Sequence, residues 1–93
     1  MARYVTLIRF TEQGARNLKN SATRAKAFRK TAERSGLKVE AQLWTAGSCD
    51  GVLILNGDER KILGCLAQLA MLGNVRTETL RAFDAKEFAA IAG

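Results

Sequence analysis

Apolar residues alternate with polar ones or form short unbroken runs in four stretches of the chain, and recur every third or fourth position in the stretches between them. The first arrangement is typical of strands and the second of helices. The pattern predicts a strand over residues 3–10, a helical turn to 18, a helix over 21–35, strands over 37–45 and 52–55, a helix over 58–72, a strand over 73–83 and a C-terminal helix. This β-α-β-β-α-β order predicts an α+β, ferredoxin-like fold with a four-stranded antiparallel sheet.

Capping residues punctuate the predicted helices. The residues placed as N-caps are Thr11, Ser21, Asp58 and Asp84, and those placed as left-handed stops are Gly36 and Gly73. Glu87 stands three positions after Asp84, which predicts a capping box, and Phe83 is positioned to contact Phe88 as a hydrophobic staple. A chain of 93 residues buries too little surface for two cores, so we expect one domain over residues 1–93.

The two long helices differ in their apolar surface. Ala25, Phe28 and Ala32 form an inward stripe on the first helix. In the second, the segment ILGCLAQLAML (62–72) has Gln68 as its one clearly polar residue, which predicts a helix covered nearly all round. Phe88 and Ile91 are expected to dock the C-terminal helix.

The middle hairpin predicts an apolar patch on the side of the sheet that the helices leave open. Residues 37–45 (LKVEAQLWT) alternate strictly, with Trp44 and the polar residues on one face, as in an edge strand. The run VLIL (52–55) is apolar at every position, so one of its faces points away from the helices. The residues expected to join that face are Trp44, Tyr4, Thr6, Ile8 and Phe10. Such a patch is large for a monomer, so we expect a second copy to pack against it, sheet to sheet, as a homodimer or higher oligomer.

Charged and hydroxyl side chains occupy the last predicted strand, GNVRTETLRAF (73–83). Arg76 and Glu78 share one face of it, and Thr77 and Thr79 share the other. One hypothesis pairs Arg76 and Glu78 with each other or, across the sheet, with Lys38 and Glu40. The alternative makes Arg76 an anion clamp and Glu78 a base in a cavity walled by Trp44 and Tyr4.

Net charge and composition exclude several classes of site. The chain carries a formal charge of +6 and a basic stripe at Lys26, Lys30 and Arg34, which is either a solvated helix face or a phosphate-binding surface. The central VLIL strand has no aromatic side chain on which a base could stack, which argues against nucleic-acid recognition. No apolar run approaches the ~20 residues of a membrane span, and no secretory signal follows Met1, so we expect a cytoplasmic protein with no membrane partner.

Histidine is absent, and the two cysteines do not form a Cys-x-x-Cys pair, so the usual zinc sites are excluded and no metal or cofactor is predicted. Cys65 lies in an apolar helical run and is interpreted as a core residue. Cys49 lies in the turn AGSCDG (46–51), where nucleophilic catalysis would need a carboxylate or lysine as base. No catalytic residue is assigned on these grounds.

The chain resembles the GYD-domain proteins. The resemblance rests on YVTLIRFTEQGARNLKNS, on LWTAGSCDGVLIL and most specifically on LGNVRTETLRAF with the acidic-aromatic tail that follows. Gly47 and Asp50 match the Gly-x-Tyr-Asp motif that gives the family its name, and Cys49 stands at the tyrosine position. The resemblance implies a ferredoxin-like fold and sheet-to-sheet dimers of the dimeric α/β-barrel type, and it carries over no reaction.

These observations favour a homo-oligomeric protein that binds a small anionic or aromatic organic molecule in a cleft at the sheet. The residues predicted to contact that molecule are Tyr4, Trp44, Cys49, Arg76 and Glu78. Two rival hypotheses stay open at this point. One is a cofactor-free isomerase or monooxygenase with Glu78 as its base, and the other is a purely structural or regulatory oligomer.

Overall fold

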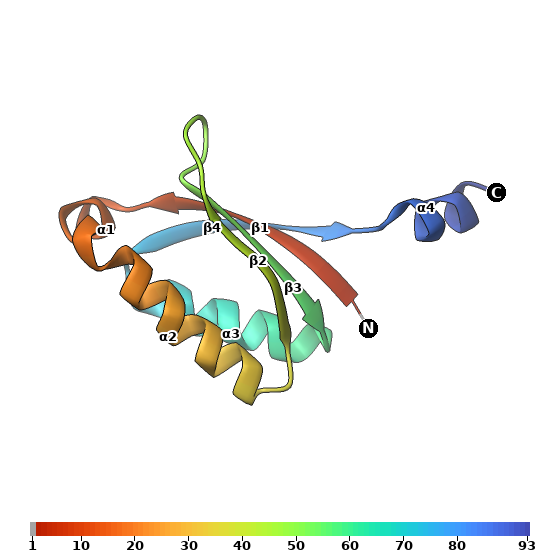
Figure 1. The fold of residues 1–93 in the computed structure, drawn as a ribbon, viewed down its shortest axis with the longest axis horizontal. Coiled ribbons are helices and arrows are strands. Elements are labelled where there is room, and N and C mark those ends of the chain that lie inside the picture. Colours follow the sequence, from red (N-terminus) through yellow and green to blue (C-terminus); the bar gives the residue numbers. More distant parts are fainter. Residues whose placement is uncertain (1) are drawn as a thin grey trace.

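The computed structural model describes residues 2–93 as one four-stranded sheet with helices (Figure 1). The elements in chain order are β1 (Ala2–Phe10), α1 (Glu12–Arg16), the 3-10 turn η1 (Leu18–Asn20), α2 (Ser21–Arg34), β2 (Lys38–Trp44), β3 (Gly51–Gly57), α3 (Glu59–Met71), β4 (Val75–Ala82) and α4 (Ala85–Ala92). The strands pair antiparallel in the order β2-β3-β1-β4. The α+β, ferredoxin-like prediction is confirmed.

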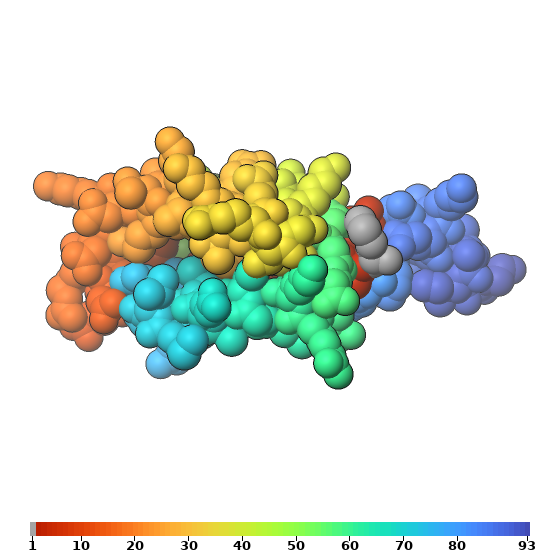
Figure 2. Space-filling view, turned by 90° about the horizontal axis from the view of Figure 1, so that it is seen from below, coloured from red at the N-terminus to blue at the C-terminus, as the bar shows by residue number. Residues whose placement is uncertain are grey.

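Helices α2 and α3 run side by side over one face of the sheet and leave the other face without a helix (Figures 1 and 2). Their inward residues meet the central strand in one core. The buried apolar residues of that core are Ala32, Leu37, Val39, Leu53, Leu55, Ile62, Cys65 and Leu66. Phe28 packs against this cluster, so the predicted stripe of α2 and the core role of Cys65 are confirmed.

Strand β3 contributes apolar side chains to both faces of the sheet. Leu53 and Leu55 are 2% and 0% exposed beneath the helices. Because successive side chains of a strand point to opposite faces, Val52 and Ile54 face the helix-free side, where they are only partly buried. We call the helix-free side the open face.

The orientation of β1 in the sheet is the reverse of the one that the sequence predicted. Its register pairs Tyr4 with Leu55 and Thr6 with Leu53, which places Tyr4, Thr6, Ile8 and Phe10 on the helix side. The prediction that these four join the open face is therefore wrong. Alternation along an isolated strand fixes which residues share a face, and only the pairing with β3 decides which face the helices cover.

A β-bulge in β2 reverses the alternation predicted for that strand. The register with β3 shifts between Val39 and Ala41. Beyond the shift, Gln42 pairs with Leu53 and Trp44 pairs with Gly51, so both turn to the helix side. The placement of Trp44 on the open face is therefore wrong, and the extra residue of the bulge is the physical reason.

The open face carries a continuous apolar surface across all four strands. Its apolar members are Val5, Leu7, Ala41, Leu43, Val52, Ile54 and Leu80, as the pairing registers place them. Leu43 and Leu80 are 58% and 46% exposed. No described element of the chain covers this surface, and the prediction of an uncovered apolar sheet face is confirmed with this different set of residues.

Most of the predicted helix ends are confirmed. The side chains of Thr11 and Asp58 accept hydrogen bonds from the Gly14 and Lys61 amides, and Asp84 forms the capping box with Glu87. Gly36 and Gly73 adopt positive φ angles of 88° and 79°. Ser21 is not the cap of α2, because η1 runs directly into the helix and Ser21 becomes its first residue.

Helices α3 and α4 expose apolar side chains that the sequence predicted to be covered. In α3 only Ile62, Cys65 and Leu66 are buried, and Leu63 and Met71 are 50% and 78% exposed. Helix α4 has no buried residue, and it extends beyond the end of the sheet (Figure 1). Helix α4 is exposed because of the strand register. Ala82 at the end of β4 pairs with Arg3 at the start of β1, so no strand lies beyond Ala82 for α4 to pack against. Within one copy, Phe88 and Ile91 therefore do not dock.

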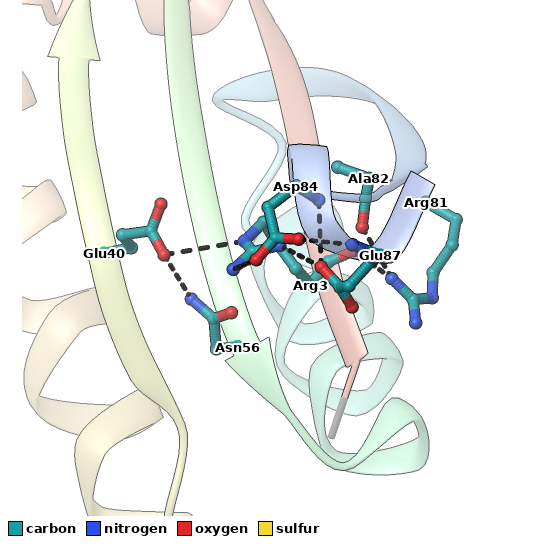
Figure 3. Close-up of polar contacts among 7 residues, drawn as sticks. All are labelled: Arg3, Glu40, Asn56, Arg81, Ala82, Asp84 and Glu87. Atoms are coloured by element: carbon teal, nitrogen blue, oxygen red, sulfur yellow. Dashed lines mark hydrogen bonds and ion pairs between the residues drawn. The ribbon is translucent and has the colours of Figure 1, made fainter. Parts of the chain in front are cut away.

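Arg3 connects α4 to the sheet (Figure 3). Its Nη1 donates to Glu87 Oε1 at 2.8 Å, and its Nε lies 3.6 Å from Glu40 Oε1. Asn56 donates to the same Glu40 oxygen at 2.9 Å. One guanidinium thus joins β1, the edge strand β2 and the capping box of α4.

The same contacts shift two pKa values in a direction that favours the charged forms. Hydrogen bonding to the Glu87 carboxylate raises the pKa of Arg3. The backbone hydrogen bond from Asp84, followed by the bond from Arg3, lowers the pKa of Glu87 from its ordinary value of 4.5. A carboxylate with a lowered folded pKa stabilises the folded state above its unfolded pKa, and that contribution is lost as the pH falls through the folded value.

We predict that acid loosens α4 through Glu87. Amide protection of α4, corrected for intrinsic exchange rates, should begin to fall as the pH drops below the ordinary glutamate value of 4.5, and the loss is complete once the pH has passed through the lowered folded pKa of Glu87. Glu87→Gln keeps an acceptor for the capping box and removes the charge, so its α4 should be less protected at neutral pH and nearly insensitive to acid. Equal pH profiles for the two proteins would contradict the role assigned to the Arg3–Glu87 pair.

Gly14 marks the close approach of α1 to the start of β4. A Cβ built at Gly14 would lie 1.9 Å from the Asn74 carbonyl oxygen, a backbone atom that cannot turn aside. Gly64, exposed on α3, has no atom within 4 Å of the same position. A methyl group would therefore clash with the backbone at position 14 and would fit without contact at position 64.

We predict opposite effects of one substitution at these two sites. Gly14→Ala should destabilise by about 1–3 kcal/mol, because the backbone must shift to admit the methyl. Gly64→Ala should stabilise by about 0.5–1 kcal/mol through helix propensity. Urea unfolding of both variants measures the difference, and a neutral Gly14→Ala would show that α1 does not press on Asn74.

Candidate functional site

A cavity of about 350 Å³ lies between the sheet and the helices, at the end where β1 and β2 finish and β3 and β4 begin. It is partly open to solvent. The large apolar residues that line it include Ile8, Phe10, Phe28, Trp44, Leu53 and Leu69. Its volume falls within the range of small-molecule sites, whose walls are mainly apolar with a few polar groups.

The bulge in β2 and the small residues of α2 create this hollow. The bulge turns Gln42 and Trp44 toward the helices at the end of the strand. Opposite them, α2 presents Ala25, whose side chain reaches only one carbon into the space. The core below Leu53 is filled, and the cavity opens where that packing stops.

Most polar groups at the cavity wall are bonded within the chain. Trp44 Nε1 donates to Ser21 Oγ at 2.9 Å, and Gln42 Nε2 donates to the Ala25 carbonyl at 2.9 Å. Asp50 Oδ2 accepts from the Phe10 amide at 2.9 Å. These bonds hold the rims of α2, β2 and β1 in place and leave few free donors facing the hollow.

Arg24 is the exception. Its Nη1 donates to the Asn17 carbonyl at 2.8 Å, and its Nη2 is the one buried side-chain nitrogen or oxygen without a hydrogen-bond partner in residues 2–93. No Asp or Glu oxygen of the described chain lies within 4.0 Å of it. Nothing in the sequence analysis singled it out, yet Arg24, Phe28 and Thr31 follow the helical i, i+4, i+7 spacing that marks an inward stripe.

The five residues predicted to contact a ligand do not come together. Trp44 lines the cavity, and Cys49 lies in the adjoining loop without lining it. Tyr4 is on the helix side at the opposite end of β1, where its hydroxyl donates to Glu59 Oε1 at 2.8 Å. Arg76 and Glu78 are on the open face, so the sheet separates them from the cavity.

Tyr4 belongs to a small polar cluster of its own. The hydrogen bond to the Glu59 carboxylate raises the pKa of Tyr4, with burial as the second cause. The Arg81 guanidinium lies 5.7 Å from the centre of its ring and 4.5 Å from that of Phe83. These contacts tie the start of β1 to α3 and to the end of β4, and they form a shallow surface rather than an enclosed pocket.

The turn that carries Cys49 is held by backbone contacts. Thr45 Oγ1 donates to the Cys49 carbonyl at 2.7 Å, and Arg9 Nε donates to the Ser48 carbonyl at 2.9 Å. The Asp50 amide donates to the Ile8 carbonyl, and its side chain accepts from the Phe10 amide. The Asp50 side chain thus bonds the end of β1, whereas in an Asx turn it would bond the backbone of its own turn. Asp50, one of the two residues that match the family motif, thus lies in one wall of the cavity.

Thr79 and Glu78 of β4 have separate structural partners. Thr79 Oγ1 bonds Thr6 Oγ1 at 3.0 Å on the helix side, as expected for a satisfied hydroxyl. Glu78 Oε1 lies 4.0 Å from Arg9 Nη1, and its side chain is 57% exposed. A pair with Lys38 or Glu40 is excluded because β2 and β4 are opposite edges of the sheet.

The base named by the enzyme hypothesis does not lie at the cavity. Glu78, the base named by the enzyme hypothesis, lies on the far side of the sheet. Within residues 2–93, no three Cys, Asp or Glu side chains gather closely enough to hold a metal ion. None of the helices described is long and apolar enough to cross a membrane.

The family comparison agrees with the resemblance found in the sequence. The model of the GYD domain matches residues 4–92, nearly the whole chain. No curated protein and no solved structure matches it significantly. On the strength of that match over β1 to α4, the chain belongs to the GYD domain family.

Proposed function

We propose that this protein is a homo-oligomeric binding protein for a small organic molecule with a largely apolar body. The observation that carries the proposal is the cavity of about 350 Å³ between the sheet and helices α2 and α3. The binding site is thus on the helix side of the sheet, and the open face serves the contact between copies.

The mainly apolar walls of the hollow favour an apolar occupant over water. Water can enter from the open side, but it finds few free polar partners on these walls. A ligand with an apolar body satisfies the walls better than water does.

We predict that adamantane-1-carboxamide, an uncharged probe with a compact apolar cage, binds in the cavity in the millimolar range or tighter. Trp44 is the single tryptophan of the chain and lines the cavity, so its emission should report occupancy. Ala25→Phe should abolish binding because its ring occupies the hollow. Ala22→Phe, an exposed position on the same helix, is the matched control and should leave binding unchanged.

A wild-type protein that binds no such probe would contradict the proposed function. The same conclusion would follow if Ala25→Phe and Ala22→Phe bound it equally well. The titration is repeated by calorimetry, so that a change in Trp44 emission is matched to a heat of binding.

The open face supports the second half of the proposal. Its apolar members span all four strands, and no described element covers them. Charged groups border them, with Arg3 and Glu40 at one end and Arg9 and Glu78 at the other. A two-fold axis brings the same patch of two copies together, and a stable interface of this kind buries about 1,600 Å² in total. We therefore propose a sheet-to-sheet homodimer.

We predict that Ile54→Glu separates the two copies. Ile54 lies on β3 at the middle of the open face, so the substitution buries an unpaired charge beside its symmetry mate. A cost of about 3–5 kcal/mol should raise the dissociation constant by more than about 100-fold. Leu63→Glu, at a 50% exposed position on α3, is the control. Sedimentation velocity at micromolar concentration measures both, and a wild-type protein that sediments as a single copy would contradict the dimer.

A further inference from the structure

Arg24 places a positive charge at the wall of an otherwise apolar cavity. It stands in the first turns of α2, one helical turn before Phe28, and both side chains line the hollow. The residue is partly buried, and its Nη2 atom is fully withdrawn from solvent. Arg24 therefore contributes to the wall of the cavity and carries a guanidinium nitrogen that no group of the described chain satisfies.

A buried guanidinium donor without an acceptor is costly, and chains rarely leave one in place. The first turn of α2 contains no acidic residue, so no nearby carboxylate on the helix neutralises the charge. Asp50 is the other charged residue of the wall, but its Oδ2 accepts from the Phe10 amide, and it makes no ion pair with Arg24. The described chain thus supplies no acceptor for Nη2, which leaves room for one from a ligand.

We propose that Arg24 anchors the anionic head group of the ligand, and that the ligand is a monocarboxylate with a compact apolar body. This inference rests on the proposed function and names the chemical class that the same cavity takes. A carboxylate accepts two parallel N–H bonds from a guanidinium, a geometry that neither a hydroxyl nor an amide reproduces. The apolar body then lies against Phe28, Trp44 and Leu53.

The single positive charge of the wall limits the head group. One guanidinium suits one carboxylate, whereas a phosphate monoester or a dicarboxylate would bring further negative charge into a space whose wall also holds Asp50. The side chains of Ser21, Gln42 and Trp44 already form hydrogen bonds within the chain, so they offer few groups that could recognise a polyhydroxylated ligand. The site is therefore specific for a ligand with one carboxylate and an apolar hydrocarbon body.

The test compares two probes that differ only in the head group, adamantane-1-carboxylate and adamantane-1-carboxamide. The wild-type protein should bind the carboxylate roughly 10- to 100-fold more tightly at pH 7, the range expected for one charged hydrogen-bonded contact. Trp44 emission and calorimetry give both dissociation constants. Because this ratio is measured on the unaltered chain, it does not depend on how any variant folds.

Variants then assign the preference to Arg24. Arg24→Met keeps much of the apolar stem and removes the charge, so it should lose most of the preference for the carboxylate while still binding the carboxamide. Arg24→Lys restores a charge without the two-pronged geometry and should recover part of the preference. Arg34→Met, at an exposed position on the same helix, is the matched control and should keep the wild-type ratio.

The outcomes separate this inference from the proposed function. Equal affinity of the wild type for the two probes, or a preference that survives in Arg24→Met, overturns the anion anchor and leaves the cavity as a binding site. Binding of neither probe overturns both. A crystal structure with adamantane-1-carboxylate should show its oxygens at the Arg24 guanidinium, and a carboxylate placed elsewhere also overturns the inference.

Discussion

The central strand β3 is apolar on both of its faces, and the rest of the structure follows from how each face is covered. Leu53 and Leu55 disappear beneath α2 and α3, where they form the middle of the core. Val52 and Ile54 meet the opposite side, which no described helix reaches. Burial of apolar surface drives folding, and the one layer of helices covers only half of β3.

The β-bulge determines what lies at the end of the helix layer. By inserting one residue between Val39 and Ala41, it turns Gln42 and Trp44 inward and sends Ala41 and Leu43 to the open face. The first consequence is the wall of the cavity, and the second is the continuity of the open apolar surface. A single local irregularity therefore shapes both surfaces on which the proposed function depends, which is a common use of bulges.

Polar networks hold the two ends of the sheet without filling the middle. At one end Arg3 joins Glu40 and the capping box of α4, and at the other Asp50 bonds the end of β1. Such exposed contacts contribute little stability each, but they fix where the chain turns. Hydrogen bonds between the residues of its rim hold the cavity in shape, and Arg24 Nη2 is the one buried side-chain atom of residues 2–93 without a hydrogen-bond partner.

The sequence by itself determined the order of the elements, most of their ends and the family. Caps at Thr11, Asp58 and Asp84 and stops at Gly36 and Gly73 depend on neighbours within a few residues, and periodicity depends on one element at a time. Tertiary structure alone decided which face of β1 the helices cover, that β2 bulges, and that Arg76 and Glu78 lie on the other side of the sheet from Trp44. These facts depend on register and packing between segments far apart in the chain, which no local pattern encodes. For the same reason the sequence did not single out Arg24, and only the fold placed its helix face against a hollow.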